Sequence, residues 1–356
     1  MRYAMKAVPG YENTRPGIQV GTKMEGPISM NKAGKITVNE EGVRFLQQIG
    51  VEWVMVGHHN VPEHSARSYK LLAEKLAEYG LKIYRLENAE LHNMPDVTLN
   101  LKDRDRMLDR YLQYISDLGE AGIHYATYAH MGNGIWRGDI RRPVRGGATA
   151  GGLDLGQPNK GFWLGEQFNW PISSGREYSA DELWENYDYF IKKVVPVAES
   201  AKVCIGIHPD DPPVYTMAGV PRPIFGSSDG YLRALDMANS PNIGVCLCVG
   251  CWLEGGKEIG LDVVDFIKVL AARKQLFKLH VRNVTAPLSA PGGFNETYPD
   301  AGYYNLLNVL SALDEVGFDG AIMNDHLIDM VGGHYTCEAY FTAYLKGAVD
   351  AVQNHG

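Results

Sequence analysis

The chain has 356 residues, 45% of them hydrophobic, and a formal net charge of −8 at pH 7. The apolar content is enough for a large core, and the acidic balance argues against nucleic acid or an anionic membrane as a partner. No apolar stretch approaches the roughly 18 residues that a membrane span needs, and the N-terminus lacks the apolar core of a signal peptide, so we expect a cytoplasmic protein.

Strand-like and helix-like segments alternate along the chain in eight successive units. The apolar runs that predict strands lie at 18–23, 51–57, 81–87, 123–131, 203–208, 243–248, 276–280 and 321–325. The amphipathic segments that predict helices lie at 38–49, 63–79, 103–121, 180–200, 228–239, 261–274, 303–316 and 335–353. Such alternation implies right-handed crossovers and a parallel sheet, and eight units imply a closed barrel. We therefore predict an α/β fold, with residues 1–356 forming a single (β/α)8 TIM-barrel domain.

An open doubly wound sheet is the alternative fold. It would usually show a Gly-rich phosphate-binding turn after an early strand, and the sequence has no such turn. His58 and His59, which follow the second predicted strand, are expected to form a solvated loop pair.

A long insertion, residues 132–180, follows the fourth predicted strand. Structureless loops beyond about 15 residues are uncommon unless they are functional or disordered. The segment is predicted to be irregular, but it carries too many apolar aromatic residues for a disordered linker: Trp136, Phe162, Trp163, Phe168 and Trp170. Because it leaves the C-terminal end of a strand, it could serve as a lid over the barrel mouth or as a subunit contact.

Four residues with metal-ligand chemistry each close one of the last four predicted strands: His208, Cys248, His280 and Asp325. In a parallel barrel their side chains would meet at the C-terminal mouth, where barrel enzymes build active sites. A thiolate and a carboxylate together balance a divalent cation, and two neutral imidazoles complete a four-point site. Sulfur favours zinc or ferrous iron, while the carboxylate and open positions equally allow manganese. The pattern therefore predicts a metal-dependent enzyme.

Residues beside these ligands carry further chemistry. If His280 points inward, strand alternation turns Lys278 and Arg282 inward as well, either as a cationic site for an anionic substrate such as a sugar acid or as an internal ion-pair layer. His326 follows the Asp ligand, so it should point differently and be free to act as an acid or base. The rigid loop at 209–213 is expected to fix the orientation of His208.

At these residues the chain resembles the mannonate dehydratase family, metal-dependent lyases of the xylose-isomerase-like TIM barrel group. The resemblance rests on four motifs in the same order and with similar spacing: His208-Pro-Asp-Asp-Pro-Pro213, Leu247-Cys248-x-Gly250, His280-x-Arg282-Asn283-Val284 and Asp325-His326. It extends more loosely upstream to the segments around Glu87 and Trp136-Arg137.

The resemblance implies a manganese-type divalent ion, with Fe²⁺ or Zn²⁺ as alternatives, held by the four ligands. It also implies acid–base work by His326 and by a tyrosine shortly downstream, Tyr335 or alternatively Tyr340. Lys278, Arg282, Asn283, Arg137 and Glu87 are then expected on the substrate side. The implied reaction removes water from a sugar acid such as D-mannonate to give a 2-keto-3-deoxy sugar acid, in a homo-oligomer.

The sequence also departs from the family pattern. Met323-Asn324 replaces Arg-Pro before the Asp-His pair, Leu327 replaces the Gly after it, and an N-terminal Arg-Trp-Tyr-Gly start is absent. A family Phe-His-Glu segment is present as Phe294-Asn295-Glu296. These differences fall on the substrate side and indicate a divergent member. Two other functions stay open: a metal-dependent sugar or sugar-acid isomerase or epimerase, and a non-catalytic barrel with a structural metal or none.

Overall fold

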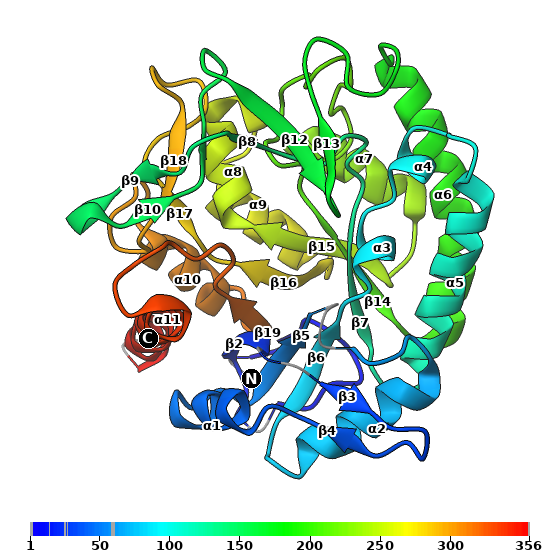
Figure 1. The fold of residues 1–356 in the computed structure, drawn as a ribbon, viewed down its shortest axis with the longest axis vertical. Helices are drawn as coiled ribbons and strands as arrows, with labels where there is room; N and C mark the ends of the chain where they lie inside the picture. Colours follow the sequence, from blue (N-terminus) through cyan, green and yellow to red (C-terminus); the bar gives the residue numbers. More distant parts are fainter. Residues whose placement is uncertain (1–2, 14, 25, 27, 58–60, 355–356) are drawn as a thin grey trace.

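The structure is a computed structural model that describes residues 3–13, 15–24, 26, 28–57 and 61–354 (Figure 1). His58 and His59 lie outside these residues, so the expectation of a solvated loop pair there stays a prediction. None of the helices in the described part of the chain combines the length and apolar character needed to cross a bilayer.

Eight parallel strands form the barrel. They are β2 (Ile18–Met24), β5 (Trp53–Val56), β6 (Lys82–Leu86), β7 (Tyr125–Ala129), β14 (Cys204–His208), β15 (Ile243–Cys248), β16 (Leu276–His280) and β19 (Phe318–Met323). Their order is β6-β5-β2-β19-β16-β15-β14-β7, which confirms the predicted TIM barrel. The order ends at β6 and β7, and an isolated parallel bridge between Asn93 and Ala129 joins the chain at this seam. The barrel is therefore nearly closed.

Eight longer helices surround the strands (Figure 1). They are α1 (Glu40–Gln48), α2 (Ala66–Ala77), α5 (Arg104–Glu120), α6 (Ala180–Ala201), α7 (Ser228–Ala238), α9 (Val263–Ala272), α10 (Leu306–Glu315) and α11 (Gly333–Asn354). The start of α6 shows why such segments become helices. Ser179 and Glu182 form a capping box, in which the hydroxyl accepts from the backbone N–H of Glu182 at 3.2 Å and the carboxylate accepts from the backbone N–H of Ser179 at 2.9 Å. These bonds satisfy backbone donors that the first helical turn leaves unpaired.

Shorter elements complete the fold. Near the N-terminus are β1 (Met5–Lys6), which pairs with β19, and the hairpin strands β3 (Ser29–Met30) and β4 (Ile36–Thr37). Short helices α3 (Ala89–His92), α4 (Pro95–Thr98) and α8 (Val249–Gly255) follow barrel strands. Helix α8, which begins directly after the last residue of β15, was not predicted from the sequence. Seven residues are too few to show helical periodicity.

The sequence predicted an irregular segment after β7. The structure instead shows paired strands within it. One antiparallel sheet holds β8 (Ile135–Gly138), β12 (Asn159–Trp163) and β13 (Glu166–Phe168), and a second pairs β9 (Arg142–Pro143) with β10 (Thr149–Ala150). A third joins β11 (Gly152–Leu153) to β18 (Phe294–Thr297) and β17 (Asn283–Val284). Strands of two to five residues are too short to show alternation in the sequence. The third sheet ties this segment to the loop after β16.

His130, just beyond β7, sits in an aromatic part of the core. Its ring packs against Tyr187, Phe190 and Phe225, and its Nδ1 lies 2.9 Å from the hydroxyl of Tyr128. Burial lowers the pKa of His130 to about 3, because the charged imidazolium would lose its hydration there. The folded protein therefore holds this imidazole neutral.

Stability should consequently fall as the pH drops below 6.5. Between pH 6.5 and 3 the unfolded chain binds a proton at His130 that the folded chain does not, which costs about 2 kcal/mol of unfolding free energy at pH 5. In urea denaturation, His130→Phe should lose less stability between pH 7 and pH 5 than the wild type, by roughly this amount. Equal pH dependence of His130→Phe and the wild type would contradict the assignment.

Candidate metal centre

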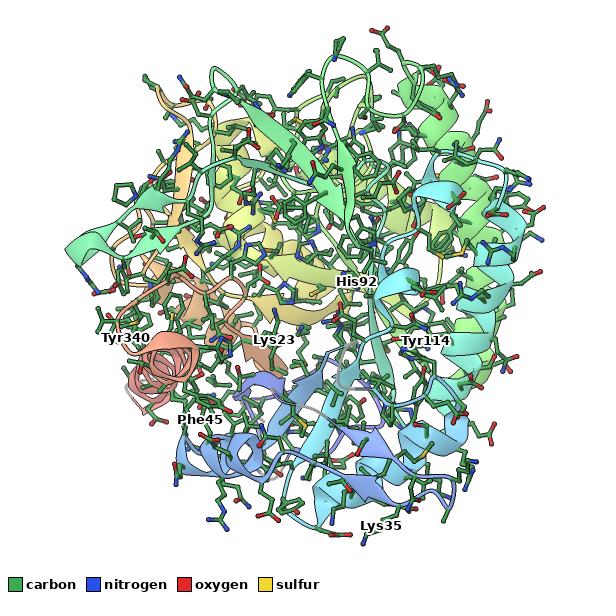
Figure 2. All side chains as sticks on the ribbon, in the orientation of Figure 1. Lys23, Lys35, Phe45, His92, Tyr114 and Tyr340 are labelled. Atoms are coloured by element: carbon green, nitrogen blue, oxygen red, sulfur yellow. The ribbon has the colours of Figure 1, made fainter. Side chains whose placement is uncertain are left out.

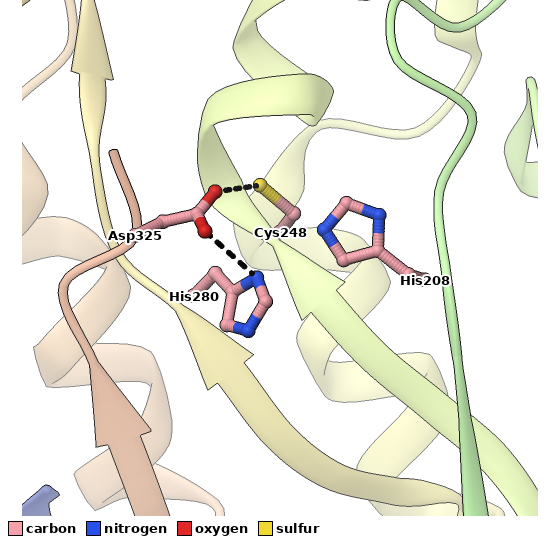
Figure 3. Close-up of side chains that lie close together, drawn as sticks. All are labelled: His208, Cys248, His280 and Asp325. Atoms are coloured by element: carbon pink, nitrogen blue, oxygen red, sulfur yellow. Dashed lines mark hydrogen bonds and ion pairs between the residues drawn. The ribbon is translucent and has the colours of Figure 1, made fainter. Parts of the chain in front are cut away.

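The four residues of ligand type meet at the C-terminal mouth of the barrel (Figure 3). His208, Cys248 and His280 are the last residues of β14, β15 and β16. Asp325 lies two residues beyond the end of β19, so it does not close that strand as the sequence suggested. The parallel register pairs Cys248 with His280, and His280 with Met323. As a result, one potential ligand atom from each of the four buried side chains lies within 4.8 Å of the others.

Contacts within this group leave its donor atoms facing one another. The Sγ atom of Cys248 is 3.5 Å from Oδ2 of Asp325, and Nδ1 of His280 is 3.4 Å from Oδ1 of Asp325. Nδ1 of His208 lies 2.8 Å from the carbonyl oxygen of Pro209, which makes Nδ1 the protonated nitrogen and leaves Nε2 available. The loop after β14 therefore fixes the orientation of this ring.

The environment of His280 tests whether the group fits a cation. Its Nδ1 is buried and has no hydrogen-bond partner among the described residues. Its Nε2 lies 2.9 Å from Nζ of Lys278 and 3.7 Å from Sγ of Cys246. A cation on Nδ1 requires the ring proton on Nε2, where the sulfur of Cys246 can accept it. A buried nitrogen that faces a thiol and a carboxylate without a hydrogen bond to either is the arrangement that a divalent metal would complete.

Electrostatics favour the ionised forms that bind metals. Burial opposes ionisation of Cys248, but hydrogen bonding with Cys251 and the charge of Arg282 hold the pKa of its thiol well below the usual range. Burial likewise opposes ionisation of Asp325, and the charges of His326, His280 and Arg282 outweigh it, so the pKa of this carboxyl is also well below its usual range. Thiolate and carboxylate are the species that a divalent cation needs.

Arg282 is the central ion of a buried charge network beneath the mouth. Its side chain is 1% exposed, its Nε donates to Oδ2 of Asp325 at 3.1 Å, and its Nη2 lies 2.8 Å from Oε1 of Glu254. Nη2 is also 3.5 Å from Asp211 and 3.4 Å from the sulfur of Cys251. Asp211, Cys251 and Glu254 could by themselves resemble a second metal site. The guanidinium among them already supplies the positive charge.

Gly250 makes room for this guanidinium. A Cβ atom at Gly250 would overlap the side chain of Arg282. The motif Leu247-Cys248-x-Gly250 therefore combines a ligand-type cysteine with the close approach that Arg282 needs.

His326 lies at the entrance to the cluster. Its Nδ1 is 2.6 Å from Oε1 of Glu296, its Nε2 is 3.7 Å from Oδ2 of Asp325, and its side chain is 31% exposed. Burial lowers the pKa of His326, but the charges of Asp325 and Glu296 raise it above the usual value overall. The imidazole is thus reachable and paired, whereas the sequence suggested a free one.

A cavity of about 400 Å³ opens beside the cluster. Its lining comprises Lys23, Ile135, Arg137, Arg141, Gly151, Phe162, Glu296, Asp325, His326, Leu327, His334 and Glu338. This volume falls in the range of small-molecule sites. Asp325 and His326 therefore face a space that could hold a substrate.

Arg137, predicted on the substrate side, lines this cavity and is also an ion-pair partner. It donates to both carboxylate oxygens of Asp211 and, at 2.9 Å, to Oε1 of Glu296. Glu87, after β6, is ion-paired with Arg85 at 2.7 Å. Arg85 in turn lies 3.1 Å from Nδ1 of His92. The structure therefore places Glu87 in a polar network after β6, and it is not among the residues that line the cavity.

Other predicted substrate-side residues lie away from the cavity. Lys278 is 0% exposed, and its Nζ lies 2.9 Å from Nε2 of His280. Burial lowers the pKa of Lys278 to about 8. The amide N–H groups of Asn283 donate to the carbonyl oxygens of Pro299 and Tyr304. It therefore holds the loop before α10, because those carbonyls would otherwise be left unpaired. Both of these side chains and Arg282 support the site from within the fold.

The two tyrosines considered as acid–base groups are also placed elsewhere. The ring of Tyr335 packs 4.6 Å from that of Phe45 and borders a hollow beside α1. His334 and Glu338, four residues apart on α11, face the cavity instead, and the helical period turns Tyr335 to a different side. Tyr340 donates to Asp300 at 3.0 Å, outside the cavity lining.

Sequence reasoning missed Glu296 and Lys23. Glu296 lies in β18, far from the strand ends that drew attention, and its only sequence signal is the Phe294-Asn295-Glu296 segment. Lys23 lies within β2, whose weakly apolar sequence gives no clear alternation that would mark an inward-facing residue.

Replacing Arg282 by Met should destabilise the protein by about 3–5 kcal/mol, because it removes one of the two guanidinium groups that neutralise the buried carboxylates of Glu254 and Asp211. The other group, Arg137, remains. Chemical denaturation would measure this loss. Lys268→Met is the control, since Lys268 forms an exposed ion pair with Glu315 at 2.9 Å and such pairs contribute little. A loss for Arg282→Met no larger than that of the control would contradict the buried network.

Comparisons with known proteins agree with the geometry. A sequence model of the family D-mannonate dehydratase (UxuA) matches residues 35–157 and 165–356. A mannonate dehydratase from Streptococcus equi subsp. zooepidemicus is 30% identical over 298 residues, covering 78% of this chain and 79% of the relative. One from Brachyspira hyodysenteriae is 27% identical over 318 residues, covering 81% of this chain and 86% of the relative.

Solved structures give the same fold. The crystal structure of mannonate dehydratase from Streptococcus suis serotype 2 superimposes with a TM-score of 0.76 at 24% identity, covering 96% of this chain and 95% of that one. A xylose isomerase domain protein from Planctomyces limnophilus gives 0.59 at 13% identity, covering 96% and 99%. From the family match and the relatives, the chain belongs to the mannonate dehydratase family and is an enzyme of the hydro-lyase class.

Proposed function

We propose that this protein binds a divalent metal ion at His208, Cys248, His280 and Asp325 and removes water from a sugar acid such as D-mannonate, giving a 2-keto-3-deoxy sugar acid. The observation that carries the proposal is the convergence of these four buried side chains within 4.8 Å, beside a cavity that also exposes His326. The names of the family and of the relatives supply the reaction class. Manganese is the proposed ion, with ferrous iron and zinc as alternatives.

The reaction has two difficult steps: loss of a weakly acidic proton next to the carboxylate, and departure of a hydroxyl group. A divalent cation bound at the four residues would supply positive charge to the carboxylate end of the substrate, which makes the neighbouring C–H more acidic. The chain's own residues must then bind the sugar acid and move the protons.

His326 is the proposed acid–base residue. It lines the cavity. Burial lowers the pKa of its imidazole, but the charges of Asp325 and Glu296 outweigh burial and raise this pKa overall. A protonated imidazole suits donation to the departing hydroxyl. The hydrogen bond from Nδ1 to Glu296 leaves Nε2 as the nitrogen that can transfer the proton. Tyr335 has no place in this proposal, because its ring lies against Phe45.

The segment at 132–180 is proposed as a lid. Ile135 and Phe162, from β8 and β12, line the cavity, so the segment forms part of its wall. The same segment exposes large apolar side chains, among them Ile140 at 77% and Trp170 at 47%. Those side chains support the further proposal that the protein assembles as a homo-oligomer.

The dehydratase assignment is tested with a panel of aldonates. Manganese-loaded protein should convert at least one of them, with D-mannonate the first candidate, into a 2-keto-3-deoxy acid, detected by mass spectrometry as a loss of one water. Zinc-loaded and iron-loaded samples show which ion supports the reaction. Interconversion of sugars or sugar acids without loss of water would instead favour the isomerase or epimerase alternative.

The ligand set and the acid–base residue are separable by mutation. Cys248→Ala should weaken manganese affinity at least tenfold, the order of magnitude seen even for indirect partners of metal sites. Cys204→Ala, which removes a buried cysteine of β14 outside the cluster, is the matched control and should bind metal normally. Metal content is measured by inductively coupled plasma mass spectrometry, and full occupancy in Cys248→Ala would exclude that ligand.

His326→Asn should keep the metal and lower kcat by about 10²–10⁴-fold, as expected for loss of a general acid or base. Both kcat and metal content are measured on the same preparation. A variant that keeps wild-type kcat at full metal content would remove His326 from the mechanism.

A further inference from the structure

Lys23 projects into the cavity from the first strand of the barrel. It is the penultimate residue of β2, and the register pairs it with Met55 of β5. The hydroxyl of the preceding residue, Thr22, bonds to Glu338 of α11. Side chains alternate along a strand, so Lys23 points to the opposite side of β2 from Thr22. Lys23 lines the same cavity as Asp325 and His326.

The place of Lys23 in the cavity lining also lets its charge act on neighbouring ionisable groups. The positive charge of Lys23 contributes to lowering the pKa of both Asp325 and Glu87, after the larger effects of nearer groups. It also contributes to lowering the pKa of Lys278, which lies behind His280. One ammonium group therefore acts on the metal cluster and on the network after β6.

Lys23 differs from the arginines that share the cavity because it has no ionic partner. Arg137 is paired with Asp211 and Glu296, and Arg141 is paired with Asp329. The side chain of Lys23 is half-buried, and its ammonium group forms no hydrogen bond or ion pair with the described residues. Of the lysine and arginine side chains lining the cavity, it alone leaves its charge available to a ligand.

Lys23 lies outside the part of the chain that the family model matches. The match to the family model begins at residue 35, so β2 lies outside the matched region. The metal cluster and His326 come from the matched part, whereas the available cation comes from the first strand. A residue in this place can change what the site accepts without changing the ligand set.

We propose that Lys23 is a substrate-binding residue whose ammonium group pairs with the carboxylate of the sugar acid and selects monocarboxylates over neutral sugars. The inference rests on the proposed function for the location of the substrate. Lys23 would add its charge to that of the metal ion at the carboxylate end of an aldonate. The second carboxylate of an aldarate would meet no further available lysine or arginine among the described residues that line the cavity. The ion pair forms in a confined cavity, where charge-assisted hydrogen bonds are strong.

The test compares binding of D-mannonate with that of its neutral amide. Isothermal titration uses manganese-loaded protein carrying His326→Asn, which slows turnover, with and without Lys23→Met. The Lys23→Met change should weaken the binding of D-mannonate about tenfold, the scale of a hydrogen bond to a charged group. The affinity for the amide should change by no more than about twofold. Lys23→Arg should recover most of the affinity because it restores the charge. Without the His326 change, Lys23→Met should raise KM more than it lowers kcat.

Lys35→Met is the matched control. Lys35 is an exposed lysine in the turn that leads into β4, far from the mouth (Figure 2), and its replacement should change neither ligand. Manganese content is measured for every variant, so that an indirect effect through Asp325 is detected as lost metal.

The outcomes separate this inference from the proposed reaction. Three outcomes would each overturn the role of Lys23, even if the wild type is a dehydratase. They are an unchanged affinity for D-mannonate in Lys23→Met, an equal loss of affinity for the amide, and a loss of affinity explained by missing metal. A parent protein with no preference for D-mannonate over the amide would overturn it as well. Conversely, a preference that depends on Lys23, with no 2-keto-3-deoxy product from the wild type, would support Lys23 and reject the dehydratase assignment.

Discussion

The buried guanidinium of Arg282 is the interaction on which the mouth of this barrel depends. It neutralises acidic groups from three separate segments, the loop after β14, helix α8 and the loop after β19, through Asp211, Glu254 and Asp325. These carboxylates could not stay buried without such a cation. Arg282 links the loop of Asp325 to helix α8, which begins directly after Cys248, and so holds the carboxylate near that cysteine. Charge neutralisation thus determines the geometry of the cluster.

The barrel could be predicted because its signal is local and repeated. Each barrel strand is a short apolar run, and each large helix has an apolar face, so eight units could be counted along the chain. The elements that were missed or misread are those whose stability comes from distant partners. Helix α8 is too short for a period, and β11 is a strand only because β18, more than 140 residues later, pairs with it. Propensity carries no information about such partners.

The site was predictable in part for the same reason. His208, Cys248 and His280 end strands, and parallel strand ends meet, so their convergence follows from topology alone. The direction of a side chain within a loop or on a helix does not follow from topology. Tyr335 faces Phe45 and not the cavity because of where α11 begins, and Asn283 is occupied by two carbonyl groups of a neighbouring loop. Glu296 reaches His326 from a strand with no ligand-like pattern. Only the folded chain shows these partners.

The pairing of β11 with β18 has a consequence for how the cavity can open. The backbone N–H of Glu296 donates to the carbonyl oxygen of Gly151 at 2.8 Å, one residue before β11. The strand that brings the carboxylate to His326 is therefore fastened to the segment that walls the cavity. Any displacement of that segment that carried β18 with it would draw Glu296 away from the imidazole and lower its affinity for a proton. Entry of a ligand and the protonation of His326 would then be thermodynamically linked, so that proton uptake or release would accompany opening and closing.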